Sequence, residues 1–325
     1  MNFIATQKLL VSILNFFGFF SFKFTKDGIS NYHIYRVIFI FIVTNLFYQI
    51  LSLYVQFNFA QTVQGYLQDD TAVTKMVMIL QGSVREFCAI VIFYSSLTSR
   101  GTQIKFFEQL IAIEMKVNLL KSSALNVKVF NQKMRSKCLV YCLTTIGLYI
   151  MMLILTINLI PNEGYSSYLY ISISFILVTI YAALIAIFMD NILTSMGFYF
   201  EEINKNIQKF AEPGSVLFRF HEFEIRDLFQ LHNELIQVIE LFNDAFGMIF
   251  VGIFVFTFGM LSCELYFSYT TFAYSIDTVE LGTAINVITN VISYIPLFMV
   301  ISKVGFTCES VQEKVSLIMD QNSFL

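Results

Sequence analysis

The chain has 325 residues, of which 57% are hydrophobic and only 13% are charged. A soluble globular domain carries about 25% charged residues, so this composition excludes an ordinary water-soluble protein. The formal net charge of −3 gives no basic excess of the kind that binds nucleic acid. We therefore interpret the chain as an all-α, polytopic bundle of transmembrane helices with no nucleic-acid partner.

Six blocks of apolar residues are long enough to cross a membrane, since a hydrocarbon layer about 30 Å thick needs about 20 apolar residues in a helix. Each block is predicted to be helical, because lipid offers no water to satisfy the backbone polar groups. A shorter apolar run, residues 9–22, is predicted to be a helix lying along the inner membrane interface. The predicted spans are residues 35–57, 72–97, 138–161, 168–198, 245–269 and 284–306.

The basic residues lie on one side of these spans. Segments 98–137 and 199–244 hold eight and four Lys and Arg residues, whereas segments 58–71, 162–167 and 270–283 hold none. Because connections rich in Lys and Arg stay in the cytoplasm, we predict a multi-pass plasma-membrane protein with a cytoplasmic N-terminus. The outer connections are short, so a ligand from outside is expected to enter the bundle itself.

Motifs that would indicate an enzyme or a metal site are absent from the sequence. It contains no Gly-rich phosphate loop, no H-E-x-x-H motif and no nucleophile elbow. The three histidines are scattered without ligand spacing, and the five cysteines fall inside or at the ends of apolar segments. We expect no enzymatic activity, no cofactor and no bound metal.

Polar residues inside predicted spans are candidate functional groups, because charge is costly in lipid. Arg85 lies midway along the span 72–97, and Gln81 precedes it by one helical turn. Two interpretations of Arg85 stay open at this point: an ion pair between helices, and a place in a ligand cavity.

The stretch LHNELIQVIELFNDAFGMIF, residues 231–250, begins in polar sequence and runs into a predicted span without a helix breaker. Its apolar residues recur at alternating intervals of three and four, as in the seam of a coiled coil, and a similar seam follows the last span. We predict that residues 201–244 and 307–320 extend the bundle into the cytoplasm, as a packing stalk or as an oligomer anchor. The anchor residues are Leu228, Leu231, Leu235, Val238, Phe242, Val311 and Val315.

The same stretch, followed by CELYFSY and then by VISKVGFTCESVQEKVSLI, resembles the C-terminal region of insect gustatory receptors. The resemblance covers the chain from about residue 35 to its end and is strongest after Leu228. It implies a tastant-gated cation channel assembled as a homo- or hetero-tetramer through the cytoplasmic helices. It also implies a seventh, pore-lining helix with a terminal signature that the sequence ending in QNSFL does not show. We therefore expect a six-span chain that is either a truncated product or a divergent member that does not conduct alone.

The resemblance further implies a ligand pocket in the outer half of the bundle. Glu264 and Tyr266, near the outer end of the span 245–269, have a suitable depth for that pocket. Tyrosines combine an apolar ring with a hydrogen-bonding hydroxyl, although aromatic belts at membrane interfaces explain several of them equally well. The predicted ligand-binding residues are Gln81, Arg85, Tyr149, Tyr181, Glu264 and Tyr266.

Together these observations predict a single receptor domain over residues 1–325. The domain is embedded in membrane lipid and senses a small tastant. Two other classes of membrane protein were weighed. A G-protein-coupled receptor needs an extracellular N-terminus, which the distribution of Lys and Arg disfavours. A transporter predicts internal repeats with broken helices, and the two halves of the sequence show no persuasive repeat.

Overall fold

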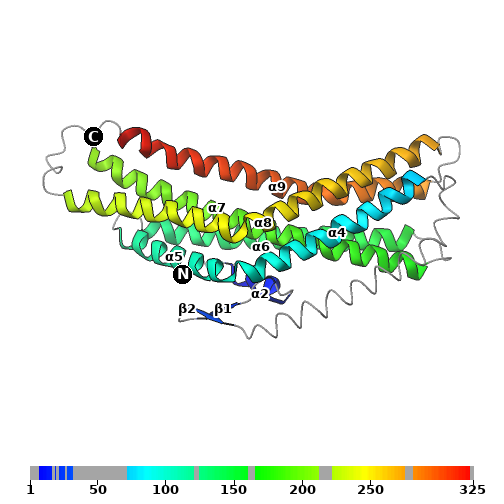
Figure 1. Ribbon diagram of the computed structural model, residues 1–325, viewed down its shortest axis with the longest axis horizontal. Coiled ribbons are helices and arrows are strands. Elements are labelled where there is room, and N and C mark those ends of the chain that lie inside the picture. Colours follow the sequence, from blue (N-terminus) through cyan, green and yellow to red (C-terminus); the bar gives the residue numbers. More distant parts are fainter. Residues whose placement is uncertain are drawn as a thin grey trace.

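The computed structural model describes residues 7–16, 19, 22–25, 28–31, 72–120, 124–159, 165–211, 222–274 and 281–322. Long helices lie side by side in an elongated bundle (Figure 1). The predicted span 35–57 lies outside the described residues. The helices are α2 (Lys8–Phe16), α4 (Ala72–Thr98), α5 (Arg100–Leu119), α6 (Ala124–Leu159), α7 (Tyr165–Ala211), α8 (Glu222–Tyr274) and α9 (Leu281–Asn322).

The other predicted spans fall on helices. The span 72–97 occupies almost all of α4, the span 138–161 takes the second half of α6, and the last three lie within α7, α8 and α9. The chain is therefore a helical membrane bundle, whereas the number of six spans and their orientation stay predictions. Among the described residues, three stretches are long and apolar enough to cross a membrane: Val178–Lys209, Ile225–Thr270 and Tyr294–Ser316.

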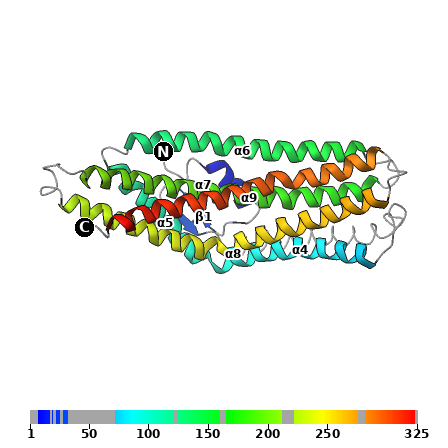
Figure 2. The same ribbon diagram turned by 90° about the horizontal axis from the view of Figure 1, so that it is seen from above.

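Helix α7 forms the centre of the bundle. Every residue from 182 to 193 is buried, and the small side chains of Ala182, Ala183 and Ala186 allow neighbouring helices to approach closely. Seen from above, α6 lies along one long side and α4 and α8 along the other, with α7 and α9 between them (Figure 2). The packing is chiefly α4 on α8 and α7 on α9.

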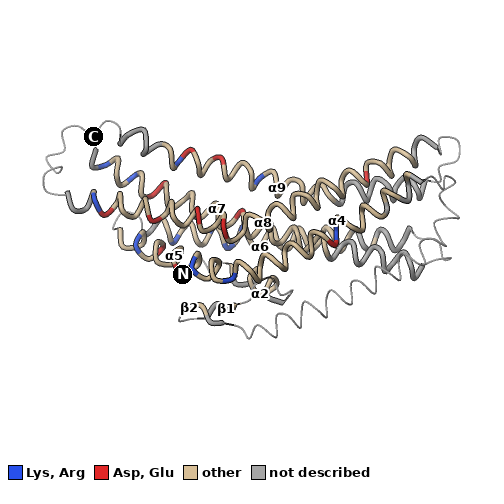
Figure 3. The backbone as a smooth tube through the Cα atoms, viewed as in Figure 1, with Lys and Arg blue, Asp and Glu red and all other residues tan. Residues whose placement is uncertain are grey.

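Charged residues gather in one half of the bundle. Figure 3 shows most of the Lys, Arg, Asp and Glu positions in the left half of α7, α8 and α9 and in α5, while the described residues of the right half include few of them. The apolar half exposes large side chains such as Leu143 on α6 and Phe258 on α8. A helical surface that is apolar outside is suited to lipid, so this half supports the predicted membrane position.

The connection 98–137, rich in Lys and Arg, is largely helical, a feature that was not predicted from the sequence. It contains α5 and the start of α6. Buried phenylalanines attach α5 to the bundle, with the Phe106 ring 5.6 Å from the rings of both Phe242 and Phe246 on α8. Phe107 contacts Phe188 of α7 at 6.1 Å. We call Phe106, Phe107, Phe188, Phe242 and Phe246 the aromatic cluster.

A small hairpin near the N-terminus was not predicted, although the fold class remains a helical bundle. Strands β1 (Phe22–Thr25) and β2 (Gly28–Asn31) pair antiparallel, with Phe22 opposite Asn31. The segment FKFT alternates apolar and polar residues, the period of a strand, and the Phe22 ring packs 5.7 Å from Phe107. The short helix predicted in residues 9–22 is present in part as α2, which ends at Phe16, whereas Phe22 begins β1. Helix α2 packs on α6 and α7, and its predicted place at the membrane interface stays a prediction.

Glycines set the close contact between α4 and α8. A Cβ atom added at Gly252 would lie 2.9 Å from Val91 Cγ1, and one added at Gly259 would lie 2.9 Å from Val84 Cγ1. Valine is branched at Cβ and cannot easily rotate away. A residue larger than glycine at these positions therefore requires Val91 or Val84 to shift.

We expect Gly259→Ala to lower the free energy of unfolding by about 1–3 kcal/mol, the usual cost of overpacking. Equilibrium unfolding of the purified protein in detergent measures this. Gly147→Ala on α6 is the matched control, because nothing lies within 4 Å of a Cβ added there. That control should gain about 0.5–1 kcal/mol from better helix propensity, and equal losses in both variants would contradict the proposed contact.

Candidate functional site

Two predicted ligand-binding residues meet inside the apolar half of the bundle. Gln81 Nε2 of α4 donates a hydrogen bond to Glu264 Oε1 of α8 across 2.9 Å. Glu264 is only 7% exposed. The side-chain amide of Gln81 therefore donates a hydrogen bond to a buried carboxyl group. The contact joins residues 183 positions apart in the sequence.

Tyr294 of α9, which was not predicted from the sequence, adds a third polar side chain to this place. It is fully buried and lies within electrostatic range of Glu264, Tyr149 and Arg85, and close to Thr179. Five helices therefore contribute polar groups to one region. We call Gln81, Arg85, Tyr149, Thr179, Glu264 and Tyr294 the midspan polar cluster.

The signal for Tyr294 was present in the sequence but weak. It stands in the run VISYIP, two residues before Pro296, and a tyrosine in such a run also suits an aromatic belt. Only the crossing of α9 over α6, α7 and α8 shows that it faces other polar groups. Thr179 gave no signal in the sequence, because a threonine hydroxyl can donate a hydrogen bond within its own helix.

The remaining two predicted ligand residues, Tyr181 and Tyr266, make aromatic contacts. The Tyr181 ring packs edge-on to Phe19, with ring centroids 6.4 Å apart, and lies near Cys88, one turn along α4 from Arg85. The Tyr266 ring contacts its neighbour Phe267 at 5.8 Å. Neither position tests a role in ligand binding, so both roles stay predictions.

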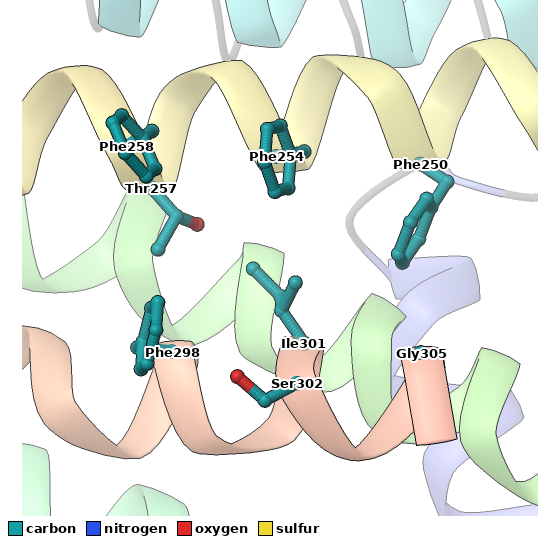
Figure 4. Close-up of a pocket in the computed structure, with 8 residues that line it drawn as sticks. All are labelled: Phe250, Phe254, Thr257, Phe258, Phe298, Ile301, Ser302 and Gly305. Carbon is teal, nitrogen blue, oxygen red and sulfur yellow. The ribbon is translucent and has the colours of Figure 1, made fainter. Parts of the chain in front are cut away.

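A second feature is an apolar groove of about 320 Å³ between α8 and α9. Figure 4 shows the rings of Phe254 and Phe258 on α8 opposite Phe298 and Ile301 on α9. The hydroxyl of Thr257 also lines it but donates to the Ile253 carbonyl of its own helix at 2.8 Å. The groove is thus lined mainly by hydrocarbon, and none of the six predicted ligand residues lines it.

The predicted anchor residues pack within the chain. Leu228, Leu231, Leu235 and Val238 of α8 are buried, and Phe242 joins the aromatic cluster. On α9, Val311 covers Gly197 of α7, where an added Cβ would lie 3.2 Å from Val311 Cγ2. Val315 is partly buried against the same core. The seam is therefore an intrachain core, and an additional role in oligomers stays a prediction.

Polar contacts connect the same helices at the charged end. Lys314 of α9 donates to Glu201 Oε2 of α7 at 3.2 Å, and Lys116 of α5 lies 2.6 Å from Glu234 of α8. Exposed ion pairs of this kind contribute little energy. Within the residues that the structure describes, no group of three or more His, Cys, Asp or Glu side chains could hold a metal ion.

The fold and the polar cluster define a class: a helical membrane protein that holds polar groups between apolar helices. The family profile described as 7tm Chemosensory receptor matches residues 7–324, nearly the whole chain, so the chain belongs to the chemosensory receptor family. This confirms the resemblance to insect gustatory receptors noted from the sequence. A comparison with curated proteins found no match.

Proposed function

We propose that this chain is a gustatory chemoreceptor subunit that binds a small tastant at the midspan polar cluster. The observation that carries the proposal is the hydrogen bond from Gln81 to the buried Glu264, with Tyr294 nearby. Polar side chains in lipid are costly, so a cluster drawn from several helices suggests a function. The chain's membership of the chemosensory receptor family supports the same reading.

The chemistry of the cluster favours a ligand rich in hydrogen-bonding groups. Carboxyl, amide and phenol side chains offer both donors and acceptors, and the surrounding apolar helices exclude water. A bound molecule that replaces the hydrogen bond between Gln81 and Glu264 would change the packing of α4 against α8.

In the proposed mechanism, tastant binding biases two arrangements of the helices, one closed and one open to cations. A ligand can shift such an equilibrium only by binding one arrangement more tightly. We place the receptor in the plasma membrane with its N-terminus in the cytoplasm, and we propose that it assembles as a tetramer of identical or related subunits. The distribution of Lys and Arg and the extended α7, α8 and α9 support this placement.

The test has two readouts. A panel of tastants is screened first for thermal stabilisation of the purified chain, which requires binding but not conduction. Stabilising compounds are then tested for currents in cells that express the chain together with related receptors. Binding and ligand-evoked current together support the proposal, and substrate uptake without current would favour a transporter.

We expect Glu264→Ala to weaken tastant binding by about tenfold, because a hydrogen bond to a charged partner contributes about 1.5–3 kcal/mol. Gln81→Ala should act in the same direction. The dissociation constant, from the dependence of thermal stabilisation on ligand concentration, is the measurement. Glu108→Ala, at an exposed position of α5, is the control, and unchanged affinity in the Glu264 variant would exclude the midspan polar cluster as the binding site.

A further inference from the structure

Asp190 of α7 is a buried carboxylate shared by two lysines from other helices. It is 1% exposed. Lys303 of α9 donates a hydrogen bond to Asp190 Oδ2, and Lys137 Nζ of α6 lies 3.8 Å from the same oxygen. Thr307 Oγ1 donates to Oδ1 at 2.9 Å. We call Lys137 and Lys303 the lysine pair.

The lysine pair has more positive charge than its partner can neutralise. Among the described side chains in contact here, two ammonium groups meet one carboxylate, and both approach the same oxygen. The two lysine side chains are 32% and 38% exposed, so the cluster opens to the surface of the bundle. Tyr141 forms one wall, with its ring centroid 4.7 Å from Lys303 Nζ and 5.7 Å from Lys137 Nζ.

The position of the lysine pair along the helices is that of a membrane boundary. Lys137 directly precedes the predicted span 138–161, and Lys303 lies three residues before the end of the predicted span 284–306. Both therefore stand at the same end of the apolar half. Whichever side of the membrane that end faces, the lysine pair lies at the depth of the phospholipid headgroups.

Exposed apolar residues continue from each lysine into the apolar half. Residues spaced by three or four along a helix share a face. On α6 such a row runs from Lys137 through Val140, Thr144, Leu148 and Met151, which are all exposed and, except for Thr144, apolar. On α9 a second row runs from Lys303 back through Met299 and Ile295, which are also exposed.

We propose that the lysine pair binds the phosphate of an anionic phospholipid, whose acyl chains lie along the two apolar rows. Phosphate oxygens accept hydrogen bonds from both ammonium groups, and one additional negative charge neutralises the excess. The rows of hydrocarbon beside the lysines favour a lipid over free phosphate as the source of that group. The inference uses the membrane position given under the proposed function, but it does not depend on tastant recognition.

Native mass spectrometry of the full chain in detergent tests the proposal. Dioleoyl phosphatidylglycerol and dioleoyl phosphatidylcholine, which share acyl chains, are titrated separately. We expect phosphatidylglycerol to bind about fivefold more tightly, since that is the effect of one basic side chain in excess near a membrane surface. In K137Q/K303Q this preference should disappear, whereas K137R/K303R should keep it because arginine preserves the charge.

Two controls make the result specific. Lys128→Gln, at an exposed position of α6 more than two turns from Lys137, should leave the preference unchanged. Millimolar inorganic phosphate should not displace phosphatidylglycerol, and displacement would overturn the assignment to a lipid. If circular dichroism shows that K137Q/K303Q does not fold, the single variant K137Q replaces it, since it keeps the contact between Lys303 and Asp190.

Equal affinity of the unmodified chain for the two lipids would overturn the inference, as would an undiminished preference in the folded glutamine variants. A chain that binds no tastant but prefers phosphatidylglycerol would refute the proposed function alone. Tastant binding without a lipid preference would refute this inference alone.

Discussion

Phe106→Ala is expected to lower the free energy of unfolding by about 3–5 kcal/mol, the range for removing a buried phenylalanine. Phe106 is 0% exposed, and its ring lies 4.9 Å from Phe107 and 5.6 Å from Phe242 and Phe246. Its loss leaves a cavity where α5 joins α8. Equilibrium unfolding of the purified protein in detergent gives the free energy directly.

The control for this prediction is Phe306→Ala, which deletes the same side chain where it is 70% exposed. A surface change of this type is expected to stay within about 0.5 kcal/mol. If both variants lose the same free energy, the aromatic cluster does not hold α5 in place. A selective loss of α5 should also appear as faster hydrogen exchange over residues 100–119.

Leu235→Ala is expected to cost about 2–5 kcal/mol of unfolding free energy, because a buried leucine loses both its transfer energy and its packing contacts. Leu235 is 0% exposed in the single chain. The loss should therefore be seen in monomeric protein and should not depend on protein concentration. Unfolding followed at two protein concentrations that differ tenfold measures both properties.

Leu119→Ala serves as the comparison, since Leu119 of α5 is 81% exposed. It should change stability by less than about 0.5 kcal/mol. A loss at Leu235 that appears only at high protein concentration would contradict an intrachain seam. That outcome would instead mean that Leu235 acts mainly between subunits.

The helices of the apolar half could be predicted closely from sequence alone. The predicted span 72–97 corresponds to α4, Ala72–Thr98, because a backbone in lipid must satisfy its own hydrogen bonds and a helix does so locally. The long polar start of α8 was predicted for a related reason. A seam of apolar residues at intervals of three and four needs no knowledge of distant partners.

Residues in the charged connection were beyond such reasoning. Phe106 stands in RGTQIKFFEQL, where the surrounding Lys, Arg and Glu residues suggested a solvated loop. Its burial depends on Phe242 and Phe246, more than 130 positions later. The hairpin of β1 and β2 was missed likewise, since each strand has only four residues.

The candidate site divides in the same way. Gln81, Arg85 and Glu264 could be selected from the sequence because polar groups inside an apolar run are costly and therefore conspicuous. Tyr294 could not be selected, because a tyrosine is unremarkable in such a run until its neighbours are known. The apolar groove between α8 and α9 could not be predicted from the sequence, because its residues resemble those of any lipid-facing helix surface.

The sequence by itself determined a helical membrane protein, the places where most helices run, and the family, because these follow from local composition and periodicity. Only the tertiary structure decided which polar groups meet. Gln81 and Glu264 are joined because α4 crosses α8 at glycines. Asp190 contacts lysines from two helices because α7 packs against both α6 and α9. Helix crossings depend on packing between distant segments, and no local pattern encodes them.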